Sequence, residues 1–167
     1  MVEVYKDLGV LVSPTLDFSE HLIHVVRNAP RLCSLIFRMF IIRQPDFYIQ
    51  LYKSLILPHF MYCSTVWRPY SKKSIEALES VQKRFVRRLA FRCGLSRKSI
   101  CLRSIADLHR EADIRMYRRL SALGLSEDMF SISSNNLRSC ITLRSLQVAR
   151  SEKVNNMFSF RVVRLLR

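Results

Sequence analysis

The chain has 167 residues, 49% of them apolar, which is enough to bury the core of one modest domain or two very small ones. Only three glycines and five prolines occur, a composition that disfavours a turn-rich β fold and favours helices. The formal net charge is +15, from 28 Lys and Arg against 13 Asp and Glu, which makes a polyanion, and nucleic acid above all, the leading class of partner.

The first predicted element is an extended segment over residues 2–12, in which Val, Tyr and Leu cluster around Gly9. A lone strand is unstable because its edges need partners. The segment therefore either packs on a helical body, as an orphan strand or hairpin, or belongs to a sheet supplied from elsewhere.

A helix is predicted to follow, with Ser19 as its N-cap. Pro30 lies inside it and predicts a kink or a break, because proline lacks the backbone donor and crowds the preceding turn. Its apolar stripe has helical spacing and comprises Leu22, Val25, Ala29, Leu32, Ile36 and Met39.

A second helix is predicted from Pro45, with Pro58 kinking or ending it and residues 59–67 continuing as helix. Its predicted apolar face is Phe47, Leu51 and Leu55, with Tyr48 beside them. The longest apolar run, residues 54–67, is too short for a membrane span, which needs about 20 residues, so no membrane contact is expected.

The stretch LPHFMYCSTVWRPY, residues 57–70, holds the only Trp of the chain. It could be an aromatic platform for nucleic acid, a metal or thiol site, or packed core. Its four rings cannot share one helical face, and a single-strand platform needs exposed rings. We therefore predict core, with Tyr62 or Trp67 giving a polar tip to a hydrogen bond and Cys63 packed as a small apolar group.

A third helix is predicted from about Ser74 to Phe91, ended by Gly94. Its inner stripe is Ile75, Leu78, Val81, Phe85 and Leu89. The candidate nucleic-acid-binding residues surround this helix: Lys72, Lys73, Lys83, Arg84, Arg87, Arg88 and Arg92. Two interpretations of these residues stay open. They could contact phosphates, or they could simply cover the solvent-facing side of the helix with their stems packed on apolar neighbours.

A fourth helix is predicted over residues 105–123, with Ser104 and Asp107 as a capping box and Gly124 after its end. Residues 95–103 before it are predicted as a loop or short helix. Its predicted inner face is Leu108, Ala112, Met116 or Ile114, Leu120 and Leu123. Residues 131–156 predict loops, short strands or disorder, and the last ten residues an amphipathic basic element that is truncated.

The charge is concentrated in the later part of the chain. Residues 1–70 carry 7 Lys and Arg and 5 Asp and Glu, a net of +2, whereas residues 71–167 carry 21 and 8, a net of +13. Arg outnumbers Lys by 21 to 7, and Arg forks onto phosphate oxygens.

The cysteines and histidines predict neither disulfides nor a metal site. The five cysteines are scattered and odd in number, and the four histidines fall into no ligand spacing with them. With no leader at the start, free thiols in a reducing, nuclear or cytoplasmic compartment fit best. No cofactor is expected, since neither a glycine-rich phosphate loop nor a nucleophile motif occurs.

Three stretches in order resemble one family, the non-LTR (LINE-type) retrotransposon reverse transcriptases. Residues 6–22, KDLGVLVSPTLDFSEHL, are similar to the segment after the palm, with the pattern K-x-L-G-V and then L-x-F-x-x-H. Residues 51–89 resemble the thumb through LY-x-SL-x-x-P-x-x-x-Y, VW-x-P and I-x-x-x-E-x-VQ-x-RF-x-R. NNLRS (135–139) and F-x-F-R-V-V-R-L (158–165) resemble downstream elements. Pro30 and Leu166 depart from the family pattern.

The resemblance implies the thumb and downstream region of such an enzyme, without its palm. The thumb of this family is a helical bundle that tracks a primer–template duplex through its backbone. A polymerase needs carboxylates converging on two Mg²⁺ ions. This sequence has no adjacent aspartates, only Asp7, Asp17, Asp46, Asp107, Asp113 and Asp128. We therefore expect no catalytic residue, no metal and no enzyme activity from this chain.

The predicted fold class is an all-α, thumb-like helical bundle with a short N-terminal strand or hairpin and an irregular C-terminal extension. The predicted domains are residues 1–18, a remnant of the palm edge; 19–124, the bundle; and 125–167, a basic and less ordered extension. The expected function is residual, sequence-nonspecific binding of RNA or DNA duplex. Alternatives are a protein interaction module, docking the missing palm or itself, and a transposon relic without selected function.

Overall fold

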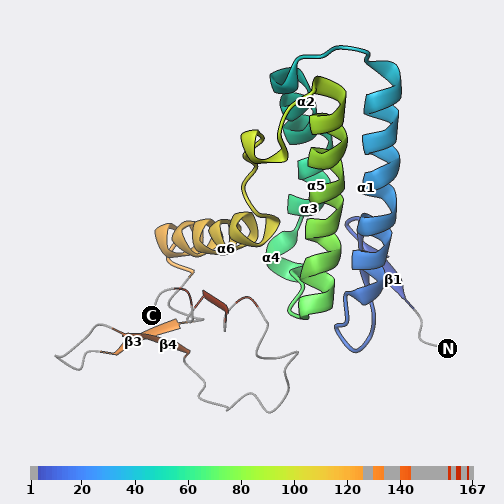
Figure 1. Cartoon of the computed structure of the whole chain (residues 1–167). Helices are drawn as coiled ribbons and strands as arrows, with labels where there is room; N and C mark the ends of the chain where they lie inside the picture. The colour runs from blue at the N-terminus through green and yellow to red at the C-terminus, as the bar shows by residue number, and fades with distance from the viewer. Residues whose placement is uncertain are drawn as a thin grey trace. The chain divides into compact units, whose positions relative to one another are not determined.

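The computed structural model describes residues 4–125, the strands Phe130–Ser133 and Cys140–Leu143, and residues 158, 161, 162 and 165. The described chain is mostly α-helical with a short N-terminal hairpin, which confirms the predicted fold class (Figure 1). It divides into two compact units, Met1–Leu108 and His109–Arg167.

The N-terminal segment is a two-stranded antiparallel hairpin of β1 (Tyr5–Asp7) and β2 (Val10–Val12). Leu8 and Gly9 form its turn, and both have positive φ, 43° and 88°, as two-residue turns of the I′ kind require. Val10 is buried and β2 packs on α1, so the hairpin obtains from the helical unit the support that a lone hairpin lacks.

Helix α1 (Ser19–Met39) runs without interruption through Pro30, so the predicted break does not occur. Ser19 is the first helical residue rather than the N-cap, and the Asp17 carboxylate accepts from its backbone N at 3.1 Å. Val25, Ala29 and further stripe residues are buried where α1 packs on α5, and this burial offsets the hydrogen bond that proline removes. Met39 was predicted inside but is exposed.

His21, at the start of α1, fastens the hairpin. Its Nδ1 accepts from the Leu11 backbone N at 3.4 Å, and its ring makes an edge contact with Trp67 at 5.0 Å between centroids. Burial, and secondarily the charge of His24, lowers the pKa of His21. An acceptor at Nδ1 requires the neutral ring, so the hairpin contact belongs to the uncharged form.

The second helical segment is built from short pieces rather than one helix. They are α2 (Pro45–Leu51), a π-helical turn (Tyr52–Ile56), α3 (Leu57–Met61) and α4 (Ser64–Trp67). The wider turn ends where the Leu57 N bonds the Tyr52 O, just before Pro58, whose missing donor disfavours a regular α turn.

The predicted apolar face of this segment is partly correct: Tyr48 is buried and Phe47 and Leu51 pack against the core, but Leu55 does not. The buried residues are Tyr48, Tyr52, Ile56 and Phe60, at a spacing of four, whereas Leu55 is 48% exposed. Leu55 and Ile56 are equally apolar, so hydrophobicity alone could not decide between the two registers. The π turn and the tyrosine hydroxyls select the observed one, since Tyr48 donates to the Phe40 O at 2.6 Å and Tyr52 to the Gln82 Oε1 at 3.2 Å.

The chain turns sharply at Tyr62 and Cys63, so the predicted helix over 59–67 is broken. Cys63 has a left-handed φ of 50°. The indole Nε1 of Trp67 donates to the Tyr62 O at 2.6 Å, and the Tyr62 hydroxyl donates to the Leu8 O at 2.7 Å. Phe60 and Trp67 are fully buried, whereas Tyr62 and Tyr70 are exposed, so the core interpretation holds for two of the four rings. Both Tyr62 and Trp67 make the predicted hydrogen bonds.

Helix α5 (Lys72–Cys93) lies at the centre of the first unit. It begins after Ser71 and ends at Gly94, whose φ of 65° is the usual left-handed helix terminus. Leu78, Val81 and Phe85 are buried as predicted, and Ile75 is half-buried. A 3-10 turn (Arg97–Ser99) follows.

Helix α6 (Ile105–Ala122) begins as predicted, since the Ser104 hydroxyl accepts from the Asp107 N at 3.1 Å. Its predicted inner face is only partly correct: His109 and Asp113 are buried, while Leu123 is 71% exposed. The burial of the Asp113 carboxylate is explained by an ion pair with Arg161.

In the second unit Arg161 forks onto Asp113, with Nε to Oδ2 at 2.9 Å and Nη2 to Oδ1 at 3.1 Å. Strands β3 (Phe130–Ser133) and β4 (Cys140–Leu143) pair antiparallel, in line with short strands after residue 131. The rest of 131–156 and most of the last ten residues lie outside the described residues.

Candidate nucleic-acid interface

Helix α5 has one apolar face inside the bundle and carries basic side chains on its other faces. Six of the seven predicted binding residues are exposed and one, Arg92, is half-buried. The exposed six are Lys72, Lys73, Lys83, Arg84, Arg87 and Arg88. They form a row along the helix rather than one cluster, because twelve residues separate Lys72 from Arg84, a rise of about 18 Å.

Arg92 has a structural role that the sequence did not predict. Its Nη2 donates to the Phe37 O at 2.9 Å and its Nη1 to the Phe40 O at 3.1 Å, and its guanidinium carbon lies 5.9 Å from the Phe37 ring centroid. These carbonyls belong to the C-terminal end of α1, which carries negative partial charge. Arg92 therefore joins α5 to the end of α1, and its donors face protein.

Arg88 contacts α1 as Arg92 does, but its side chain also faces solvent. Its Nη1 donates to the Ser34 Oγ of α1 at 3.2 Å, and its guanidinium carbon lies 5.0 Å from the Phe37 ring centroid. The side chain is nevertheless exposed. A guanidinium with five donors that uses one here keeps others for a ligand.

Within the described residues, Arg84 and Arg87 are exposed and make no contact with α1 that would hold their guanidinium groups. Arg84 makes only long contacts to Ser80 of its own helix, Nε to O at 3.4 Å and Nη2 to Oγ at 3.5 Å. Arg97, from the 3-10 turn, joins them, although a sequence that predicts only a loop or short helix over residues 95–103 gave no signal of this. No carboxylate forms an ion pair with Arg84, Arg87 or Arg97 within the described part of the chain.

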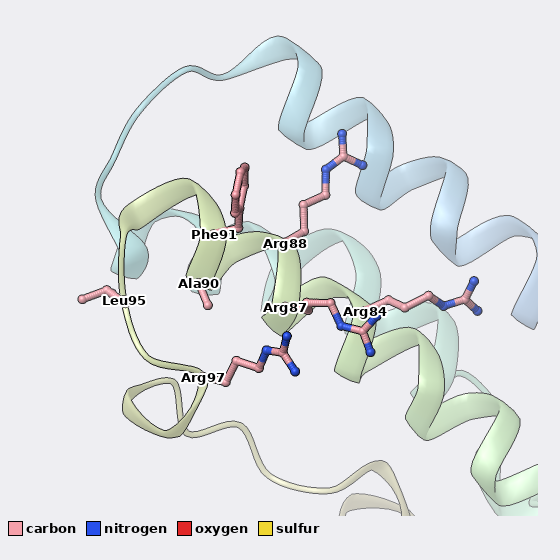
Figure 2. A pocket seen from close by; sticks show the side chains of 7 residues that line it. All are labelled: Arg84, Arg87, Arg88, Ala90, Phe91, Leu95 and Arg97. Carbon is pink, nitrogen blue, oxygen red and sulfur yellow. The ribbon is translucent and has the colours of Figure 1, made fainter.

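These arginines line an open hollow of about 550 Å³ at the C-terminal end of α5, which we call the α5 hollow (Figure 2). Figure 2 shows Arg87 on the helix and Arg97 on the chain that follows, both extended over this surface. The lining residues are Arg84, Arg87, Arg88, Ala90, Phe91, Leu95 and Arg97. Guanidinium groups that meet no carboxylate, gathered around a hollow, favour a bound anion.

The other end of α5 is also basic. Lys72 and Lys73 occupy its first turn, which holds no acidic residue. Cations at a helix N-terminus oppose the helix dipole at a cost of about 0.3–1 kcal/mol each. Two such lysines stabilise the helix less than acidic residues there would.

The buried thiol of the first unit, Cys33, is a poor nucleophile. Cys33 is buried, and burial raises the pKa of its thiol to about 11, so it is protonated at neutral pH and weakly nucleophilic. No group of three metal-ligating side chains occurs among the described residues. In the same part of the chain no helix is long and apolar enough to cross a membrane.

Comparison with known proteins leaves the family open. No family model matches the chain, and no solved structure matches it. An uncharacterized protein of Caenorhabditis elegans, B0403.1, is 32% identical over 94 residues, which cover 56% of this chain and 48% of that protein. The match thus spans about half the length of this relative.

Proposed function

We propose that this chain binds the backbone of duplex RNA or DNA, without sequence preference, through a basic face on α5 and the 3-10 turn that follows it. This basic face comprises Lys72, Lys73, Lys83, Arg84, Arg87, Arg88 and Arg97. The observation that carries the proposal is the row of exposed cations on one helix whose guanidinium groups meet no carboxylate in the described residues. Contacts of this kind position a duplex and carry little sequence information.

The sequence resemblance supports a specific origin for this surface: the thumb and downstream region of a LINE-type reverse transcriptase. On this proposal the chain binds a primer–template duplex but does not extend it. The sequence has no adjacent aspartates of the kind that hold the two metal ions of a polymerase. A primer-extension assay with Mg²⁺ tests this part, and template-dependent extension by the chain alone would refute it.

Binding is tested by fluorescence anisotropy with a short labelled duplex over a range of salt concentrations. Each phosphate contact releases counterions, so the logarithm of the binding constant should fall by roughly 0.9 per contact for each tenfold rise in salt. Several contacts give a steep dependence. Binding that is independent of salt, or absent at low salt, refutes the proposal.

A charge-matched pair of variants localises the surface. Replacing Lys83, Arg84 and Arg87 by Glu reverses the basic face while sparing Arg88 and Arg92, which contact α1. The control replaces three exposed arginines of α6 by Glu and changes the net charge by the same amount: Arg115, Arg118 and Arg119. The α5 variant should lose most of the binding and the control much less. Equal losses would mean that net charge, not the α5 face, drives binding.

A second candidate function, protein interaction, is favoured by the outer surface of the hairpin. Leu8 is 81% exposed at the turn, and all three residues of β1 are exposed. An exposed strand edge beside apolar side chains fits a palm-like domain or a second copy of the chain. Sizing before and after nuclease treatment separates the two functions, because nuclease-resistant oligomers support interaction and nuclease-sensitive complexes support nucleic-acid binding.

A further inference from the structure

Phe91 is 91% exposed although it lies on a well-packed helix. Single exposed apolar residues are common on protein surfaces. Phe91 differs from these because it lines the α5 hollow together with four guanidinium groups and the half-exposed Leu95 (Figure 2). An apolar ring among unneutralised cations is a specific combination that the duplex contact proposed above does not use.

The backbone fixes this combination. Arg87 lies one helical turn before Phe91, and both residues line the hollow. Gly94 then reverses the chain with its positive φ, and the Leu95 N bonds back to the Ala90 O at 2.9 Å. This closed helix end brings the following turn, with Arg97, back to the hollow.

Each part of the hollow recognises a different part of one ligand. Guanidinium forks match phosphate oxygens, and a flat accessible ring stacks on a base, a contact that tolerates any base because every base has a π face. Phosphate alone would leave the ring unused, and an apolar ligand would leave the cations unpaired. A volume of about 550 Å³ lies within the range of small-ligand sites, roughly 300–1,000 Å³.

We propose that the α5 hollow holds an unpaired nucleotide at the end of the duplex, with its phosphate on Arg87 and Arg97 and its base stacked on Phe91. This inference rests on the proposed duplex binding. An acidic peptide with an aromatic residue is the competing ligand. The nucleotide is favoured because Lys83, Lys73 and Lys72 continue the positive charge along α5 beyond the hollow, which suits a polyanion that runs onward as a duplex.

Three duplexes of one sequence test the inference by anisotropy: one blunt, one with a single-stranded overhang, and one with an abasic overhang of the same length. The wild-type chain should bind the overhang duplex about five-fold more tightly, or better, than the other two, since stacking on an aromatic ring is worth roughly that factor per base. Equal affinity for the normal and abasic overhangs overturns the inference.

Substitutions identify the ring. Phe91→Ala should abolish the preference for the overhang and leave blunt-duplex affinity unchanged, whereas Phe91→Trp should keep the preference. Ile41→Ala removes another exposed apolar side chain, outside the hollow, and is the matched control. Because Trp67 is buried, Phe91→Trp also supplies an exposed indole, and its emission should be quenched more by the overhang than by the blunt duplex.

The outcomes distinguish this inference from the function on which it rests. If the wild-type chain binds none of the three duplexes, the blunt one included, the proposed function is refuted. Salt-dependent blunt binding with an overhang preference that survives Phe91→Ala refutes only the nucleotide site. Tight binding of a polyglutamate peptide carrying one Tyr, lost in Phe91→Ala, would assign the hollow to acidic peptides and overturn the inference as well.

Discussion

Arg92→Met tests whether the basic side chains of α5 divide between folding and binding. The substitution keeps an apolar stem but removes the donors to the Phe37 and Phe40 carbonyls. A hydrogen bond to a charged group contributes about 1.5–3 kcal/mol. The Phe40 O retains the Tyr48 hydroxyl as a donor, so the loss should correspond to little more than one such bond. We expect the free energy of unfolding to fall by about 2 kcal/mol.

The assay is urea unfolding followed by tryptophan fluorescence. Trp67 is the only Trp and is buried in the first unit, so its emission reports the unit in which Arg92 lies. Duplex affinity of the folded variant is measured in parallel. It should change little, because the guanidinium of Arg92 faces the end of α1.

Arg87→Met is the matched control for this prediction. Arg87 is exposed and has no hydrogen bond or ion pair with the described residues, so its replacement should change stability by less than about 0.5 kcal/mol while weakening duplex binding. The reasoning is refuted if Arg92→Met unfolds like wild type, or if the two variants lose stability and affinity in the same proportion.

Three further predictions concern the core. Folding lowers the pKa of His21, so the unfolded chain takes up a proton at a higher pH than the folded chain does. The free energy of unfolding should therefore fall as the pH drops from about 6.5 toward the lower folded pKa. Urea melts over a pH series measure this, and a His21→Gln variant with the same dependence of stability on pH as wild type would contradict it. Tyr52→Phe leaves Gln82 without its buried donor and should lower the unfolding free energy by about 1–2 kcal/mol in the same melts, so a neutral effect would count against the bond. Buried Cys33, with a thiol pKa near 11, should react with a thiol reagent far more slowly than exposed Cys101, as mass spectrometry of partial labelling can show; equal rates would contradict the burial.

The sequence predicted the helices well where apolar spacing and end signals agree. On α5 the predicted stripe from Leu78 to Leu89 is buried, and Gly94 ends the helix. It failed where two registers are equally apolar, as at Leu55 and Ile56. It also failed on α6, where Asp113 is buried because of Arg161, a partner 48 residues away that local spacing cannot reveal.

The candidate site was predicted only in part, because local spacing does not show which residues of a helix meet a distant partner. Spacing places Lys83, Arg87 and Phe91 on one row of α5 and Arg84, Arg88 and Arg92 on the next, but it cannot say which row faces α1. The contacts to Ser34, Phe37 and Phe40 show that the second row faces α1. Arg88 donates one hydrogen bond to α1, and Arg92 donates two to the carbonyls at its C-terminal end.

The first row stays in solvent along its whole length. It begins with cations and ends on a bare aromatic ring beside Arg97, a residue that spacing on α5 could not have included. A ligand that follows this row meets charge first and a stacking surface last. A duplex whose paired part ends before the hollow fits that order, and a uniformly charged or a uniformly apolar partner does not.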